Sequence, residues 1–167
     1  MRRLSLTAAF LVLVGSMMTA APVAGASPVV RADVEGKPIA VDEIPNYYCH
    51  DHAFPVIHCY RTSVALEAAV LAAPSFDALA TSAGDYVIMY SGQTYSGSYM
   101  YVSQDYSILA LVGWNDRVRS YRGLNSARGT FWTDWYASGM RTDFCCNATV
   151  PGLSAGFDQA FSSVYRR

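Results

Sequence analysis

The sequence has few charged side chains and almost no lysine. Charged residues make up 15% of its 167 residues, and Lys37 is the one lysine. Loss of an N-terminal leader containing two arginines would leave 12 − 2 = 10 basic against 13 acidic side chains, a formal charge of −3. Such a chain lacks the basic surface that binds nucleic acid or an anionic membrane, so we expect neither as a partner.

Short motifs of common hydrolases are also missing. The sequence contains neither G-x-S-x-G nor H-E-x-x-H, and no pair of carboxylates stands out as an acid and a base. All three histidines, His50, His52 and His58, lie within the stretch YYCHDHAFPVIHCY at 47–60. We therefore expect a protein that is not an enzyme.

That stretch offers two cysteines and three histidines, which could supply a tetrahedral zinc site. Its spacing contains neither C-x-x-C nor H-x-x-x-H, the pairs typical of zinc sites. An exported protein also favours oxidised sulfur. The preferred interpretation is a disulfide-tied loop with histidines at its surface.

No hydrophobic run is as long as a typical membrane span, and the longest one, at 4–18, is short for that role. It follows two arginines and precedes a series of small residues, an order typical of a secretory signal peptide. We predict a signal peptide at 1–26, cleavage before Ser27, and a secreted protein without a membrane segment after cleavage. An uncleaved membrane anchor is the alternative.

Four cysteines remain after export: Cys49, Cys59, Cys145 and Cys146. An even number in an exported chain of this size indicates two disulfides. A bond between the adjacent pair is disfavoured, because disulfide geometry places Cα atoms roughly 5.5 Å apart and chain neighbours lie about 3.8 Å apart. We favour two bridges from the N-terminal pair to the C-terminal pair. A local Cys49–Cys59 bridge that leaves two thiols is the alternative.

Two segments precede the region of predicted strands. Residues 27–46 are rich in Pro, Val, Asp and Glu without a period, which predicts an extended or disordered arm. A cysteine loop and a short helix follow at 47–84, the helix starting at Thr62 and ending before Pro74. Its narrow apolar face, expected to pack on the later sheet, comprises Val64, Leu66, Val70 and Leu71.

Alternating side chains predict strands from Asp85 onward. Tyr86, Ile88 and Tyr90 face one side of the first strand, with Val and Met between them on the other. The order of features in 85–127 returns in 128–167, which indicates two copies of one motif. Short strands at this spacing, without long helices between them, predict an all-β sandwich.

Each copy pairs a hairpin with a polar segment some twenty residues later. In the first copy, the hairpin Tyr90–Gly97 has two aromatic residues and a glycine, and the segment is NDRVRS at 115–120. Together they resemble the βγ-crystallin fold, whose exported bacterial members include a metalloproteinase inhibitor of streptomycetes. The resemblance covers 85–167. It implies a two-motif Greek-key β-sandwich preceded by a short helical, disulfide-tied N-terminal extension.

The resemblance also implies calcium sites, through a signature of Asn/Asp, Asn/Asp, two free positions, Ser/Thr and Ser in each motif. In the first copy Asn115 and Asp116 begin the signature, but Arg119 stands where a hydroxyl ligand is needed. A guanidinium there removes a ligand and repels the ion, because calcium takes oxygen ligands. This site is expected to be weakened or lost.

In the second copy Asp158 begins the signature, with Gln159 at the second place and Ser162 and Ser163 at its end. We expect a calcium site built around Asp158, Gln159 and Ser162, with carbonyl oxygens from the turns near Ser91 or Thr133. The alternative is that Ser120 and Ser163 only bond the hairpin backbone of their own motifs.

Two further expectations concern the second hairpin and the partner. Trp132 to Tyr136 is one residue shorter than the family spacing and Gly139 comes one residue late, which predicts a distorted turn. The inhibitor members suggest a secreted protease as an alternative partner, bound by a rigid loop at 47–60 or 145–156.

Overall fold

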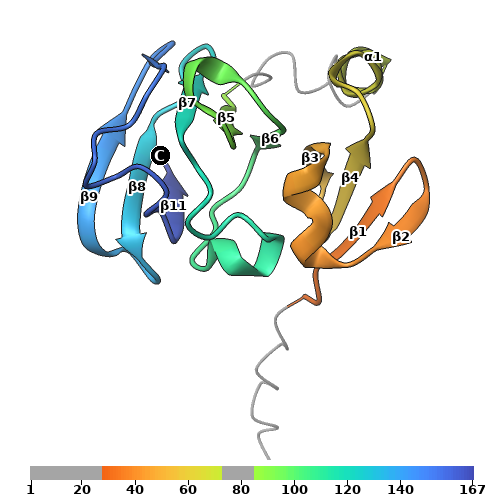
Figure 1. Cartoon of the computed structure of the whole chain (residues 1–167), viewed down its shortest axis with the longest axis horizontal. Helices are drawn as coiled ribbons and strands as arrows, with labels where there is room; N and C mark the ends of the chain where they lie inside the picture. The colour runs from red at the N-terminus through yellow and green to blue at the C-terminus, as the bar shows by residue number, and fades with distance from the viewer. Residues whose placement is uncertain (1–27, 73–84) are drawn as a thin grey trace, which may run out of the picture.

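A computed structural model of the chain describes residues 28–72 and 85–167 (Figure 1). The predicted signal peptide and the end of the predicted helix segment at Pro74 lie outside these residues. Among the described residues, every helix is too short or too polar to cross a lipid bilayer.

The elements follow one another as a series of short strands with one α-helix. In chain order they are β1 (Arg31–Val34), β2 (Lys37–Ile39), η1 (Val41–Asn46), β3 (Tyr48–Ala53), β4 (Val56–Tyr60), α1 (Ser63–Ala72), β5 (Val87–Tyr90), η2 (Gln93–Tyr95), β6 (Tyr99–Val102), η3 (Leu109–Val112), β7 (Ser120–Gly123), β8 (Gly129–Asp134), β9 (Ser138–Phe144), β10 (Thr149–Val150) and β11 (Ser163–Arg166).

The strands form two sheets, and backbone pairing links the two motifs on both of them. The larger has the order β10-β7-β5-β6-β3-β4-β1-β2, and the smaller β11-β8-β9. β10 of the second motif pairs with β7 of the first, while Tyr106 of the first motif forms a bridge with Val164 on β11 of the second. This exchange makes the two motifs one Greek-key sandwich, as predicted.

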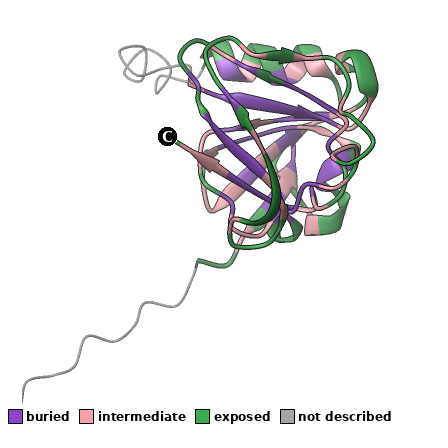
Figure 2. Ribbon diagram, turned by 90° about the vertical axis from the view of Figure 1, so that its left-hand side faces the viewer, coloured by how far each residue is buried: buried purple, intermediate pink, exposed green. Residues whose placement is uncertain are grey.

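The main core lies between the sheets. Val87 and Met89 of β5 point into it with no exposed surface, which confirms their predicted face of the strand. The largest fully buried side chains are Trp114, Phe131 and Phe161. In Figure 2 the buried strands run through the middle of the molecule, with exposed residues around them.

The other face of β5 borders a second apolar cluster, to which α1 contributes from its position over β3 and β4. Ile88 and Tyr90 pack with Leu66 and Val70 of the helix in a second apolar cluster. The predicted helix is therefore present and does pack on the sheet. Its predicted apolar face is narrower than expected, since Val64 and Leu71 are 73% and 82% exposed.

The N-terminal segments extend the sheet of the first motif. β1 and β2 form an antiparallel hairpin, β1 runs parallel to β4, and β3 runs parallel to β6 with Cys49 opposite Met100. The segment predicted to be an extended or disordered arm thus holds the ordered strands β1 and β2 and the helix η1, and the predicted loop at 47–60 is the β3–β4 hairpin. The physical reason is that β6 and β4 offer edges, whose backbone groups gain hydrogen bonds from β3 and β1 respectively.

A buried carboxylate holds this added part in place. Asp51 of β3 is fully buried and accepts hydrogen bonds from Ser103 N at 2.8 Å, Ser103 Oγ at 2.6 Å and the Tyr106 hydroxyl at 2.8 Å. Burial raises the pKa of Asp51, and the bonds from Ser103 and Tyr106 partly offset that rise. The three donors make the extension and the first motif one packed unit.

The disulfides differ from the favoured pairing. Cys49 bonds Cys59 across the β3–β4 hairpin, where the two residues are register partners, and Cys145 bonds Cys146. The favoured bridges between the two pairs are wrong, because β3 and β4 place Cys49 and Cys59 opposite each other with Cα atoms 4.1 Å apart. The bond between chain neighbours, which we expected to be disfavoured, is present as well.

The histidines are less exposed than predicted, since one is buried and the other two are partly exposed. His50 is 8% exposed, its ring lies 4.6 Å from that of His52, and burial lowers the pKa of His50 to about 3 and that of His52 to about 4. His58 Nδ1 lies 2.8 Å from Asp33 Oδ2. Within 28–72 and 85–167, no group of three His, Cys, Asp or Glu side chains is arranged to hold a metal ion.

Candidate calcium sites at the two signature turns

The two hairpins have the same backbone shape. Positive φ angles occur at Thr94, Tyr95 and Gly97 in the first and at Tyr136, Ala137 and Gly139 in the second. The second turn is therefore regular, and the predicted distortion is wrong. Gly139 stands in the place of Gly97, and its φ of 77° is one that glycine adopts without strain. The aromatic residue alone has moved: Ala137 replaces the inner tyrosine, and Tyr136 is 67% exposed.

A serine ties each hairpin to the last strand of its motif. Ser120 Oγ donates to Gly92 O at 2.6 Å and accepts from Tyr95 N at 3.1 Å. Ser163 Oγ donates to Asp134 O at 2.7 Å and accepts from Ala137 N at 3.3 Å. Both serines are fully buried. The last position of each signature thus has a structural role, as the alternative interpretation proposed.

The two signature segments bond each other across the interface of the motifs. Asp116 and Gln159, the second residue of each signature, both have left-handed backbone conformations, with φ of 55° and 56°. Asp116 N donates to Phe161 O and Gln159 N donates to Val118 O, each at 3.0 Å. This reciprocal pairing creates two equivalent places, each of which combines the start of one signature with the fifth position of the other. The first place holds Arg119 and Asp158, and the second place holds Ser162 and Asp116.

At the first of these two places, a guanidinium lies against a carboxylate. Arg119 Nε donates to Asp158 Oδ1 at 3.1 Å and Arg119 Nη2 donates to Asp158 Oδ2 at 2.9 Å. Both carboxylate oxygens are therefore used in a two-bond ion pair. A cation of the protein itself already neutralises the group that a calcium ion would need.

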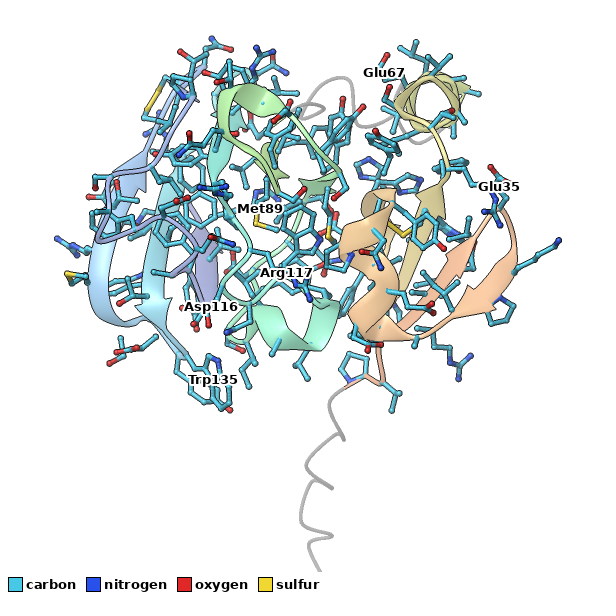
Figure 3. All side chains as sticks on the ribbon, in the orientation of Figure 1. Glu35, Glu67, Met89, Asp116, Arg117 and Trp135 are labelled. Carbon is cyan, nitrogen blue, oxygen red and sulfur yellow. A yellow bond between two sulfur atoms is a disulfide. The ribbon has the colours of Figure 1, made fainter. Side chains whose placement is uncertain are left out.

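At the second of these two places, Ser162 occupies the position that Arg119 occupies at the first place. Its hydroxyl bonds the carboxylate of Asp116, which also accepts from Asn115 Nδ2 at 2.6 Å. Asn115 Oδ1 accepts from Trp135 Nε1 at 3.1 Å. Trp135 and Ser162 line a surface hollow together with Asp134 and Ser138. In Figure 3, Asp116 and Trp135 lie near each other at one end of the molecule.

The residues predicted to share one site are therefore divided between two. Asp158 faces Arg119, whereas Ser162 faces Asp116, so the expected site around Asp158, Gln159 and Ser162 is not formed by those residues together. Of the turns expected to supply carbonyl oxygens, the one after Thr133 borders the place with Ser162. Asp134 and Trp135 of that turn were not singled out from the sequence.

The electrostatics of the second place favour a cation. Burial raises the pKa of Asp116, an effect that the hydrogen bonds from Asn115 and Ser162 partly offset. No basic side chain pairs with Asp116 among the ion pairs of the described residues. A carboxylate, a hydroxyl, an amide oxygen and neighbouring carbonyls are the oxygen ligands that calcium takes.

Among known proteins, the similarity found is to solved structures, and it covers about half of this chain. No family model and no curated protein matches the sequence. Among solved structures, a βγ-crystallin from Ciona intestinalis has a TM-score of 0.45 and 21% identity over 49% of this chain and 99% of its own. A βγ-crystallin domain from Flavobacterium johnsoniae has a TM-score of 0.43 and 21% identity over 48% and 92%. A βγ-crystallin from an archaeon has a TM-score of 0.42 and 21% identity over 50% and 99%.

Proposed function

We propose that this protein is a secreted, βγ-crystallin-like binding protein that takes one calcium ion, at the place formed by Asn115, Asp116 and Ser162. The other signature place, with Arg119 and Asp158, binds none. The order of an N-terminal charge, an apolar run and small residues at 1–26 supports export. Extracellular calcium modules work at affinities of about 10⁻⁴ to 10⁻³ M, which suits such a small ligand set.

One observation carries the proposal: equivalent positions hold a guanidinium in one place and a hydroxyl in the other. Arg119 donates two hydrogen bonds to Asp158, while Ser162 shares a hydrogen bond with Asp116. A calcium ion at the first place would have to displace Arg119 and suffer its repulsion. At the second place, the ion could take oxygen ligands from Asp116, Ser162, Asn115 and the turn at 134–135, and no ion pair of Asp116 among the described residues would have to be broken.

Calorimetric titration of the secreted protein with calcium tests this function. We expect one ion per chain. Asp116→Asn and Ser162→Ala should weaken binding at least about tenfold, because each removes a ligand or its charge. The control is Asp158→Asn, which changes the carboxylate of the other place and should leave the stoichiometry and the affinity unchanged.

Two results would contradict the proposal. One is the absence of both heat and a thermal shift at millimolar calcium. The other is a loss of binding in Asp158→Asn with normal binding in Asp116→Asn, which would place the ion at the wrong signature. Secretion is checked separately, by N-terminal sequencing of the protein from the culture medium, which should begin at Ser27.

Protease inhibition is a second candidate, favoured by the exposed segment after β9. Residues 145–156 are exposed for most of their length and begin with the Cys145–Cys146 bond, which limits their freedom. A restrained segment loses little entropy when a protease binds it. The other loop considered, 47–60, is a hairpin within the larger sheet and is poorly presented. A panel of secreted metalloproteinases tests this function, and no inhibition at high micromolar protein would exclude it.

A further inference from the structure

A second surface pocket lies away from the proposed calcium site, between α1 and the outer face of the larger sheet. Strands β5, β6 and β7 form its floor, and Ser63 and Glu67 of α1 form one wall. Figure 3 shows Glu67 on α1, at the opposite end of the molecule from Asp116 and Trp135. The pocket is therefore separate from the proposed calcium site.

Its lining is aromatic and polar at the same time. Ten residues line it, and eight of these carry polar side-chain atoms, whereas Ile88 and Leu124 are aliphatic. Four of the eight are tyrosines: Tyr90, Tyr95, Tyr99 and Tyr101. Tyrosine presents a flat apolar ring together with a hydroxyl, so such a surface can contact the face of a ligand and bond its rim.

The tyrosine rings are held by one another. Tyr90 lies 5.3 Å from Tyr99 and 5.6 Å from Tyr95 between ring centroids, and Tyr99 lies 5.9 Å from Tyr101. Tyr90 and Tyr99 are nearly buried, while the rings of Tyr95 and Tyr101 remain partly open. Burial raises the pKa of Tyr90 to about 12, so its hydroxyl stays protonated at neutral pH and can donate. The floor is thus ordered before any ligand arrives.

Opposite charges stand on two sides of this floor. Glu67 Oε1 accepts from the Tyr99 hydroxyl at 3.1 Å, and the Arg122 guanidinium lies 3.9 Å from the ring centroid of Tyr95. Both Glu67 and Arg122 are exposed, so each keeps free hydrogen-bonding capacity. One side of the pocket accepts hydrogen bonds and the other donates them.

We propose that this pocket binds a neutral saccharide residue. The C–H bonds of a sugar ring would lie against the open rings of Tyr95 and Tyr101, since a ring face carries negative charge and a C–H bond is weakly positive. Its hydroxyl groups, which both donate and accept, would bond Glu67 and Arg122.

The same groups disfavour other ligand classes. A free anion would meet the carboxylate of Glu67, and a free cation would meet the guanidinium of Arg122. A proline-rich peptide binds grooves whose aromatic walls are mainly apolar, whereas most of this lining is polar. Glycoside hydrolysis uses two carboxylates, and Glu67 is the one carboxylate in the lining of this described pocket, so the proposed activity is binding without cleavage.

Calorimetric titration with three neutral oligosaccharides tests the proposal: cellotetraose, mannotetraose and the tetramer of N-acetylglucosamine. At least one should bind at millimolar affinity or better. Tyr101→Ala and Glu67→Gln should each weaken that binding about tenfold, because each removes a stacking face or a strong acceptor. Val64→Ala is the matched control on the same helix, since Val64 is 73% exposed and outside the pocket, and it should bind normally.

Several outcomes would overturn this inference. One is that none of the three sugars shows saturable binding at concentrations well above millimolar. Another is that an oligoproline peptide binds in their place. If Tyr101→Ala fails to fold, Tyr101→Phe replaces it and should bind the sugar, because the phenylalanine keeps the ring. The loss of binding is then tested with Glu67→Gln. Sugar binding that Glu67→Gln leaves unchanged would mean a different site. Chelation of calcium should have no effect, which separates this result from the calcium proposal.

Discussion

The two motifs share a backbone but differ in what surrounds them. Each has the same hairpin with left-handed residues at matching places, and a buried serine bonds each hairpin in the same way. The first motif lies inside an eight-stranded sheet that the N-terminal extension completes, whereas the second forms a three-stranded sheet. At the signature turns the first supplies Arg119 and the second Ser162. Equal folds can thus carry unequal edges and unequal residues at the signature turns.

The largest effect is expected where the extension joins the first motif. Asp51→Ala leaves Ser103 N, Ser103 Oγ and the Tyr106 hydroxyl without their acceptor. The free energy of unfolding should fall by about 3 to 5 kcal/mol, because buried donors would lose their partner. Urea unfolding measures this fall.

The control for this experiment is Asp105→Ala. Asp105 is exposed and accepts one hydrogen bond, from Arg166 N. Its removal should cost about 1 kcal/mol or less. Equal effects of the two substitutions would mean that the extension is not anchored to the first motif through Asp51.

Acid should act on the extension before it acts on the second motif. His50 and His52, with pKa values of about 3 and about 4 in the folded chain, stay neutral where an unfolded chain, titrating near pH 6.5, takes up protons. Their stabilising contribution is complete above about pH 6.5 and is lost as the pH falls toward about 4. Between these pH values, the contribution of His50 to the free energy of unfolding changes by up to about 1.4 kcal/mol per pH unit.

Urea unfolding at a series of pH values shows this slope. His50→Gln should flatten it between about pH 6.5 and about pH 4, since one of the two buried titrating groups is removed. His58→Gln is the control, because His58 has a side chain 37% exposed and should leave the slope steep. A slope that is unchanged in His50→Gln would contradict the assignment.

Matched serine substitutions test whether the two hairpins are equivalent. Ser120→Ala and Ser163→Ala each remove one hydroxyl that bonds a hairpin carbonyl and a hairpin N–H. Each should lower the free energy of unfolding by about 1 to 3 kcal/mol. Thermal unfolding provides the measurement. Ser96→Ala, on the exposed side of the first turn, should change stability by about 0.5 kcal/mol or less. A large difference between Ser120→Ala and Ser163→Ala would break the equivalence.

The smallest change in stability, with a clear change in binding, is expected for Arg119→Ser. The substitution gives the first place the hydroxyl that the second has, and it frees both oxygens of Asp158. Calorimetric titration should show the calcium stoichiometry rising from one to two. Arg119→Lys is the control, because it keeps a cation there and should leave the stoichiometry at one. An unchanged titration with Arg119→Ser would mean that residues other than Arg119 decide the difference.

Local patterns predicted what depends on local geometry. The alternation from Tyr86 to Tyr90 identified the two faces of β5, because side chains on a strand point to opposite sides wherever the strand lies. The helix from Ser63 to Ala72 followed from its composition. The signature turns were also found from their residue types, since each needs short polar side chains at fixed places.

Contacts between distant segments could not be predicted in the same way. The sequence aligned Asp158 with Ser162 because they stand in one signature, yet the exchange between motifs places Asp158 beside Arg119 and Ser162 beside Asp116. The segment 31–39 has no strong period, and it becomes strands because β4 offers an edge to pair with.

The sequence by itself determined two motifs, a β-sandwich and a helix, because these depend on residue type and period. Only the tertiary structure decided the Cys49–Cys59 pairing, the burial of His50 and Asp51, and the partner of each signature residue. Those features depend on which strand lies beside which, and strand pairing over long separations is set by the packing of the whole chain.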